Sequence, residues 1–366
     1  MKSRGILFAI HQIAGLTVGL LLLVIGLSGS SVVFWQQIDL AITPELQRIA
    51  TTSQVSYDKM LEAARAENTG EPLLGVVGFE GNVRTPVSMT AQKQYRQYFI
   101  DPRSYQVIGS RIFQQSPMGW LYTLHTQLLA GDAGLSAVGV LGIVMVVVSI
   151  TGLSLWPGWR KLGAGLSVRL NAPWPVIAYD LHKLTGLVAF TFLMLLGATG
   201  AAMAFRQPFD LAIHRLSSTP QPALLTSRVI PGQVPLPVDV LASEAVRVLP
   251  GGRLESALLA AKPDGVVQLF YDLEGEGAAS HHAQVHLDQY SGRVLRVDDG
   301  RKPSAAQAII NWVGPLHYGT YGGAPVQALY VLVGLAPGTL FLTGFSLWLR
   351  KLGSKPRRET GVAPGE

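Results

Sequence analysis

Residues His11 to Ile42 read HQIAGLTVGLLLLVIGLSGSSVVFWQQIDLAI and carry the main signal for the fold. As far as Trp35 it is almost wholly apolar, long enough to cross the roughly 30 Å hydrocarbon core of a bilayer as a helix. The ionisable side chain of His11 is costly in such a run. The run is too long for a cleavable signal peptide, and no small-residue cleavage site follows Trp35, so we expect a retained anchor.

The composition is that of an integral membrane protein. The chain has 366 residues, of which 48% are hydrophobic and 14% are charged, whereas soluble domains are about 25% charged. We expect four membrane spans, at residues 6–35, 135–156, 177–205 and 326–349. The chain has no cysteine, which excludes disulfides, thiolate iron–sulfur ligation, redox CxxC pairs and covalent haem attachment.

Basic residues predict the topology. They cluster before the first span, between the second and third, and after the fourth, at Lys2, Arg4, Arg160, Lys161, Arg169, Arg350, Lys351, Lys355, Arg357 and Arg358. By the positive-inside rule we expect both termini in the cytoplasm and the two long polar stretches outside it. The clusters are short and the net charge is only +6, so we predict no nucleic-acid partner. Aromatic residues near the span ends fit interfacial belts: Trp35, Trp156, Trp348 and Tyr330.

The chain contains an internal repeat. The opening stretch matches HKLTGLVAFTFLMLLGATGAAMAFRQPFDLAI, which begins at His182, at an offset of 171 residues (182 − 11). A second match joins WLYTLHTQLLAG, with His125, to WVGPLHYGTYGG, with His317, at an offset of 192 (317 − 125). The same offset carries TGLSLW from Thr151 onto TGFSLW from Thr343. Each half then reads span, outer segment, span, which predicts two parallel pseudo-symmetric repeats.

Each outer segment predicts a small α+β module. The first reads as a helix at 57–66 and strands near 73–80, 86–90 and 95–101. The second reads as a helix at 238–248 and strands near 253–260, 266–271 and 283–288. The predicted divisions are 1–35 (first span), 36–116 (first module), 117–160 (interfacial helix and second span), 161–176 (cytoplasmic loop), 177–206 (third span), 207–303 (second module), 304–352 (interfacial segment and fourth span) and 353–366 (disordered tail).

Four histidines occupy equivalent positions in the two halves. His11 and His182 lie near the cytoplasmic starts of their spans, and His125 and His317 lie just before the second and fourth spans, on the outer side. One such histidine could snorkel to the interface or bond to backbone. Two imidazoles that face each other across an axis can supply both axial ligands of one haem iron. The spacing therefore favours two b-type haems, one near each face.

The residues beside these histidines also fit roles that need no haem. Gly15 and Gly186 each lie four residues after a histidine, on the same helix face, and could make room for a macrocycle or for close helix packing. Zinc would need more ligands, and the carboxylate of Asp180 beside His182 is matched by Ala9 in the first half. A proton relay would be expected to include acidic residues inside the spans.

Further residues are candidates for contact with a substrate on the outer side. His214 lies just past the third span, and Trp120, Trp312 and Tyr321 lie near the outer histidines. Interfacial anchoring explains these aromatic residues equally well. His282 and His286 share a strand face, where a solvated surface is the simpler interpretation than a metal site. No flavin, nicotinamide or P-loop motif is convincing, so reducing equivalents would come from a partner or the membrane.

These residues resemble the PepSY-associated transmembrane family. The likeness covers about residues 5–352 and rests on HQIAGLTVGLLLLVIGLSG, on LHTQLLAG with SITGLSLW, and on the strands FIDPRSYQVIG and VHLDQYSGRVL, which look like PepSY modules. It implies a bacterial inner-membrane protein with periplasmic modules, membrane lipid around it, and similarity to di-haem reductases that release iron from ferric siderophores, including those of the hydroxamate type. LHYGTYGG departs from the family's leucine-rich pattern after its histidine.

The resulting hypothesis is an oxidoreductase that works as a transmembrane electron relay. A reductant of unspecified identity reduces a haem held by His11 and His182, and the electron continues through a haem held by His125 and His317 to a ferric siderophore. One alternative is a non-redox PepSY membrane protein that binds peptides or regulates a protease. The other is a siderophore permease component, which four spans without a polar path disfavour.

Overall fold

A computed structural model describes residues 2–43, 55–68, 70–79, 83–90, 92–273 and 282–353. The predicted tail beyond Gly353 and His281 lie outside these residues.

Four apolar helical segments form a bundle. The helices are α1 (Lys2–Val32), α6 (Gly131–Leu155), α8 (Trp174–Ala204) and the pair α12 (Gly323–Val333) and α13 (Ala336–Gly353). Four segments are long and apolar enough to cross a membrane, which agrees with the four predicted spans. Neighbours pack in the order α1, α6, α8, α13 and back to α1. The helices α1 and α8, which carry His11 and His182, are therefore diagonal to each other.

The fourth span contains the predicted residues 326–349, but a break between α12 and α13 interrupts its helix. The helix stops at Val333 and restarts at Ala336 because Pro337 has no N–H for the carbonyl four residues earlier. Gly334 also lies at the break, where a Cβ would meet the Ser30 hydroxyl and the Gly26 carbonyl of α1. The Ser30 hydroxyl donates 2.8 Å to the carbonyl of Val331, which satisfies a backbone group that the break leaves open.

Shorter helices connect the bundle to the outer domain. They are α2 (Trp35–Ile42), α5 (Pro117–Gln127), α9 (Arg206–Leu216), α11 (Ala305–Tyr318) and, at the other end, α7 (Leu162–Leu166), with 3-10 turns η1 (Phe113–Gln115), η2 (Pro157–Trp159) and η3 (Thr320–Gly322). The chain passes from α5 into α6 through Leu128 and Leu129, whose φ angles are +48° and +58°. Left-handed backbone costs a residue with a Cβ roughly 1–2 kcal/mol, so packing around this turn offsets that strain.

The two outer modules share one sheet, which the sequence did not predict. Its strands are β1 (Leu73–Phe79), β2 (Val83–Met89), β3 (Tyr95–Ile100), β4 (Val107–Ile112), β5 (Gly252–Leu258), β6 (Val266–Leu273), β7 (His282–Asp288) and β8 (Val294–Asp299). They run in the order β4-β3-β2-β1-β5-β6-β7-β8, with every neighbouring pair antiparallel. The pairing of β1 with β5 closes an edge that each module alone would leave open.

The helices of the two modules cap each other. These helices, α4 (Tyr57–Glu67) and α10 (Val238–Val248), agree with the predicted ranges to within a residue. The Asp58 carboxylate accepts hydrogen bonds from the backbone N–H groups of Val238 and Asp239, each at 2.8 Å. The Asp239 carboxylate accepts one from the N–H of Tyr57 at 2.8 Å. Each aspartate thus satisfies the open N–H groups at the other helix's start.

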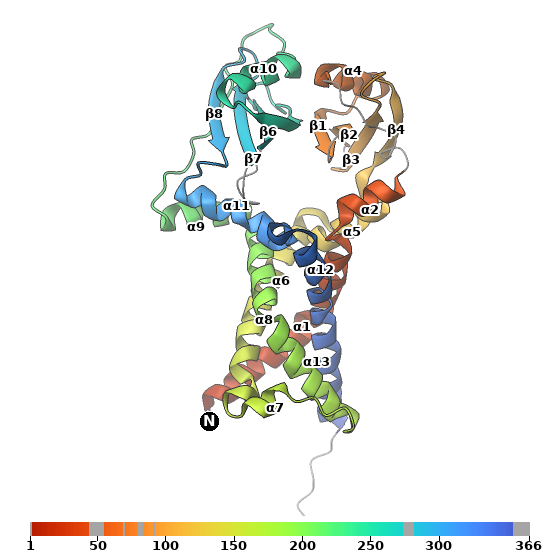
Figure 1. Ribbon diagram of the computed structural model, residues 1–366, viewed down its shortest axis with the longest axis vertical. Helices are drawn as coiled ribbons and strands as arrows, with labels where there is room; N and C mark the ends of the chain where they lie inside the picture. Colours follow the sequence, from red (N-terminus) through yellow and green to blue (C-terminus); the bar gives the residue numbers. More distant parts are fainter. Residues whose placement is uncertain are drawn as a thin grey trace, which may run out of the picture.

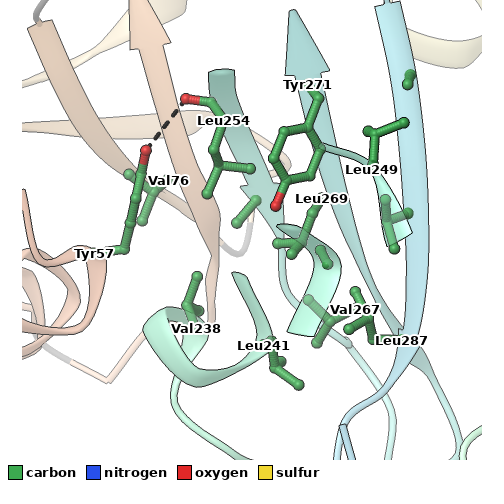
Figure 2. Packing of buried hydrophobic residues seen from close by; sticks show 14 of the residues in the cluster. Tyr57, Val76, Val238, Leu241, Leu249, Leu254, Val267, Leu269, Tyr271 and Leu287 are labelled. Carbon is green, nitrogen blue, oxygen red and sulfur yellow. Dashed lines mark hydrogen bonds between the residues drawn. The ribbon is translucent and has the colours of Figure 1, made fainter. Parts of the chain in front are cut away.

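A hydrophobic core shared by the two modules lies beneath these helices. Tyr57, Leu61 and Val76 of the first module pack against Leu241 and Leu269 of the second (Figure 2). The Tyr57 hydroxyl donates to the carbonyl of Leu254 at 3.2 Å, beside the irregular register of β5 with β6. Apolar surface from both modules is buried in this cluster, whereas a smaller cluster around Met60, Tyr98 and Ile100 belongs to the first module alone.

An ion pair ties the outer domain to the bundle in the first half. Asp39 of α2 is 2% exposed, and its Oδ1 accepts from Nη1 of Arg111 in β4 at 2.8 Å. The same guanidinium donates to Gln97 and Thr43. Figure 1 shows the start of α1, the connector with α7 and the end of α13 at one end of the bundle, with the sheet beyond the other end.

Substitution of Asp58 by alanine tests the reciprocal caps. The Asp58→Ala variant leaves two N–H groups of α10 without an acceptor, and we expect a loss of about 1–2 kcal/mol in the stability of the outer domain. Thermal unfolding of the detergent-solubilised chain measures it. Glu62→Ala, on the exposed side of α4, is the matched control and should leave the transition within error. Equal effects of the two variants would contradict the capping.

Candidate functional site

The structure brings the repeat-related histidines together in two pairs. His11 and His182, from the diagonal helices α1 and α8, have ring centroids 6.1 Å apart and planes at 89°. We call them the inner pair. His125 of α5 and His317 of α11 have centroids 6.2 Å apart and planes at 41°. We call them the outer pair, because it lies at the end of the bundle nearer the sheet.

Each ring of the inner pair is held through Nδ1 by a neighbouring helix. Nδ1 of His11 lies 3.1 Å from the carbonyl of Val148 and 3.1 Å from the hydroxyl of Thr151, both in α6. Nδ1 of His182 lies 3.0 Å from the hydroxyl of Thr343 in α13. The rings are therefore fixed by the two helices that separate α1 from α8.

The outer pair is held in the same way. Nδ1 of His125 lies 3.0 Å from the carbonyl of Ile25, with the Ser28 hydroxyl at 3.5 Å, both in α1. Nδ1 of His317 lies 2.9 Å from the hydroxyl of Thr199 in α8. Burial lowers the pKa of His125, and it lowers that of His317 to about 3. Both outer imidazoles are thus neutral at neutral pH, which is the form that binds metals.

These contacts decide which nitrogen of each ring carries the proton. A carbonyl only accepts, so Nδ1 of His11 and of His125 must donate. The hydroxyls of Thr343 and Thr199 already donate to helix carbonyls, at 2.6 and 2.7 Å, so they too accept from the ring. Within the described parts of the chain, no hydrogen bond reaches any of the four Nε2 atoms. Each Nε2 therefore keeps a lone pair for a ligand.

A glycine follows each of these hydroxyl residues and makes room for the ring. A Cβ added at Gly29 would come within 2.8 Å of Cε1 of His125, and one at Gly200 within 3.2 Å of Cε1 of His317. A Cβ at Gly152 would lie 3.0 Å from Cε1 of His11, and one at Gly344 3.2 Å from Cε1 of His182. All four rings therefore sit on a Ser/Thr-Gly dipeptide of another helix, which we call the cradle.

The separation within each pair suits one metal ion bound between two rings. Imidazoles on opposite sides of an ion, with metal–nitrogen distances of about 2.0 Å, have ring centres roughly 6.3 Å apart. The observed separations are 6.1 and 6.2 Å. Among the residues that the structure describes, no group of three or more His, Asp or Glu side chains could hold an ion. Two imidazoles fill two coordination positions of an ion, so another group would have to fill the remaining coordination positions.

The glycines after the inner histidines border open space. A Cβ at Gly15 would meet no atom within 4 Å, and one at Gly186 would meet only a methyl of Leu340, at 3.6 Å. Gly19 and Gly26 border no such open space. A Cβ at Gly19 would collide with Phe341, and a Cβ at Gly26 would collide with the Gly334 carbonyl. Close helix packing explains the second two glycines. The first two leave room beside the inner pair for a bound group.

Asp180 serves a different role from ligation. Its side chain is 0% exposed and accepts from Arg169 at 2.8 and 3.0 Å and from Lys183 at 2.7 Å. Lys183 also donates 2.6 Å to the carbonyl of Ala164 in α7. This network ties the connector with α7 to the end of the bundle, and the carboxylate is fully used in it.

The other predicted residues lie apart from the pairs. His214 is 6% exposed, and its Nδ1 lies 3.3 Å from the Thr219 carbonyl, so it is buried at the end of α9. The predicted solvated strand face was wrong for His286, which is buried against Asp298 and Arg296, whereas His282 is exposed. The exposed aromatic candidates lie on the same elements as the outer pair or directly after them, namely Trp120, Trp312 and Tyr321.

Sequence reasoning missed the cradles. A signal was present, because Thr151-Gly152 and Thr343-Gly344 are 192 residues apart (343 − 151), as His125 and His317 are. Ser28-Gly29 and Thr199-Gly200 are 171 apart (199 − 28), as His11 and His182 are. The repeat selected these dipeptides, but nothing in one chain showed that each faces a histidine more than 90 residues away.

Substitution at a cradle glycine tests the packing of the rings. In Gly29→Ala the new methyl would overlap the His125 ring, and we expect a loss of about 1–3 kcal/mol through overpacking. Thermal unfolding of the purified chain measures it. Gly5→Ala, in the same helix α1, is the control, because its methyl would meet no atom within 4 Å. A Gly29 variant as stable as the Gly5 variant would mean that the ring lies elsewhere.

Comparison with known proteins places the whole chain in one family. A family model described as "PepSY-associated TM region" matches residues 8–351. The chain is also 25% identical over 267 residues to the uncharacterized protein PA4219 of Pseudomonas aeruginosa, an alignment that covers 64% of each chain and so less than two thirds of that relative. Because the family model spans nearly every described residue, this protein belongs to the PepSY-associated transmembrane family.

Proposed function

We propose that this protein is an inner-membrane di-haem reductase that passes electrons across the membrane to reduce ferric siderophore iron in the periplasm. The observation that carries the proposal is that the repeat-related imidazoles lie in two pairs, one towards each end of the bundle, with ring centroids 6.1 and 6.2 Å apart, and that no hydrogen bond from the described residues reaches any Nε2. Neutral imidazole is the usual nitrogen ligand of haem iron. Without cysteine, the haems would be of the non-covalent b type.

The proposal includes two parallel pseudo-symmetric repeats and one orientation of the chain in the membrane. The two recurring offsets support the repeats: the inner histidines and the cradles of the outer pair are 171 residues apart, and the outer histidines and the cradles of the inner pair are 192 apart. Basic residues Arg4, Arg160 and Arg350 belong to the bundle end opposite the sheet, and the positive-inside rule assigns that end to the cytoplasm. Both termini would then be cytoplasmic, and the outer domain would be periplasmic.

The residues of this chain would perform four tasks. His11 and His182 would hold one haem, and His125 and His317 would hold the other. The cradle hydroxyls, together with the carbonyls of Val148 and Ile25, orient the rings and keep the proton on Nδ1, so that Nε2 remains the ligand. The apolar bundle excludes water from the space between the pairs. Bound haem would supply reversible one-electron transfer.

The proposed substrate is ferric iron in an oxygen-rich chelator such as a hydroxamate siderophore. Hard oxygen ligands hold Fe(III) more tightly than Fe(II), so the addition of one electron weakens the complex and releases iron. Trp120, Trp312 and Tyr321 are exposed around the outer pair, where they can contact such a ligand or anchor the protein at the interface. The electron would come from a reductant at the cytoplasmic face or in the membrane.

Haem content of paired variants tests the assignment. We expect the purified protein to carry two b-type haems with bis-imidazole spectra. The double variant His11→Ala with His182→Ala should lose one haem per chain, and His125→Ala with His317→Ala should lose the other. A pyridine haemochrome assay against protein concentration gives the ratio. The His282→Ala variant, with an exposed imidazole, should keep both haems.

A colourless purified protein would contradict the proposal, provided that it was expressed with sufficient haem. Haem content unchanged by both double variants would contradict the assignment of ligands.

The plane angles predict that the two haems differ spectroscopically. Perpendicular imidazole planes leave two iron d orbitals nearly equal in energy and give a strongly anisotropic low-spin ferric signal, whereas planes closer to parallel give an ordinary rhombic one. The angles are 89° for the inner pair and 41° for the outer pair. Electron paramagnetic resonance of the oxidised protein should therefore show two signals, of which the inner double variant removes the more anisotropic. A single signal that accounts for both haems would disagree with this geometry.

A peptide-binding role is the alternative that one observation favours. A cleft of about 530 Å³ lies where the modules meet, with Leu61, Leu241 and Val267 among its walls and Glu62 and Arg65 at α4. Its size falls within the range of small-ligand sites. A non-redox protein of this kind would bind peptide with no haem present, so the haem assay separates the two functions.

A further inference from the structure

Tyr330 of α12 is a tyrosine buried inside the bundle. The sequence predicts it as an interfacial anchor, but the structure leaves it only 3% exposed. Its ring contacts Phe192 of α8 edge-on, with centroids 5.9 Å apart, and Tyr321 of η3, at 6.4 Å. A Cβ added at Gly319 would come within 3.2 Å of the ring. The side chain is thus enclosed by α8 and by the turn that ends α11.

The Tyr330 hydroxyl reaches the residue before His317. It donates a hydrogen bond of 2.8 Å to the carbonyl of Leu316, which lies in the last turn of α11. Carbonyls of a last helical turn have no partner within the helix. Gly319, at φ +73°, turns the chain away at this point, so the phenol supplies the donor that the departing backbone does not.

In the first half, the equivalent helix end is completed without a hydrogen bond from a side chain. The residue that matches Leu316 at the offset of 192 is Leu124 (316 − 192), and its carbonyl accepts from the backbone N–H of Leu128 at 3.0 Å. The residue that matches Tyr330 is Val138 (330 − 192), which has no donor. The turn through Leu128 and Leu129 therefore completes the end of α5 with backbone groups. In the second half, LHYGTYGG replaces that turn.

We propose that Tyr330 is a positioning residue for His317. Its hydroxyl holds the peptide beside His317, so that the imidazole stays both on the Thr199 hydroxyl and opposite His125. The outer ligands then depend on different supports, His125 on a backbone turn and His317 on a buried phenol. The role in ligation rests on the proposed haem function, whereas the support of the helix end does not.

The Tyr330→Phe variant removes the hydroxyl and keeps the ring. Hydrogen exchange of the full-length purified protein should show amides of residues 316–320 exchanging about five- to tenfold faster, as expected for the loss of one buried hydrogen bond. In the oxidised protein, the resonance signal assigned to the outer pair should shift or partly convert to high spin. The inner signal should keep its position.

Tyr318→Phe is the matched control. Tyr318 also lies next to His317, with ring centroids 5.8 Å apart, but its hydroxyl makes no hydrogen bond within the described residues. It should leave both the exchange rates and the outer signal as in the parent protein.

Parent-like exchange and an unchanged outer signal in Tyr330→Phe would overturn the inference, as would equal effects in both variants. Parent protein without haem would refute the proposed function, and faster exchange in Tyr330→Phe alone would still establish the support of the helix end.

Discussion

The hydrogen bond from each histidine Nδ1 to an oxygen of a neighbouring helix is the constraint on which the centre of the bundle depends. An imidazole among apolar side chains must satisfy at least one nitrogen, and here the partners are Val148, Ile25, Thr343 and Thr199. With Nδ1 so placed, each ring lies over the glycine of its cradle. The inner pair thereby ties α1 to α6 and α8 to α13, and the outer pair ties α5 to α1 and α11 to α8. Nε2 of every ring is left for a ligand.

The two halves meet this constraint with different local chemistry. In the first half each Nδ1 has both a backbone carbonyl and a hydroxyl beside it, and the turn after His125 is completed by backbone. In the second half the acceptors are threonine hydroxyls, and a buried tyrosine completes the turn after His317. Each pair contains one ring from each half, so the two rings within a pair are held differently, and the support from Tyr330 applies only to the outer pair.

The outer domain depends on contacts between the modules. The pairing of β1 with β5, the exchanged caps of Asp58 and Asp239 and the common core around Leu269 each join residues of both halves. The ion pair of Asp39 with Arg111 then attaches this unit to the helix that follows α1. In the second half Asp210 takes the position of Asp39 and pairs with Arg206 of its own helix. The attachment through this position is therefore one-sided.

Hydropathy and repeat offsets were enough to predict the four spans, the module helices and the pairing of the histidines, because these signals are local or come from comparing the chain with itself. The cradles appeared only in three dimensions, since Thr343 meets His182 across 161 residues. The same holds for the β1–β5 junction and for Tyr330, whose burial depends on where Phe192 and Gly319 lie. Pro337 is a local signal for the helix break at Gly334. No local signal showed that the Ser30 hydroxyl would bond to the carbonyl left open at the break. A pattern fixes which face of an element is apolar, whereas the partner on that face is decided by how the helices and strands pack.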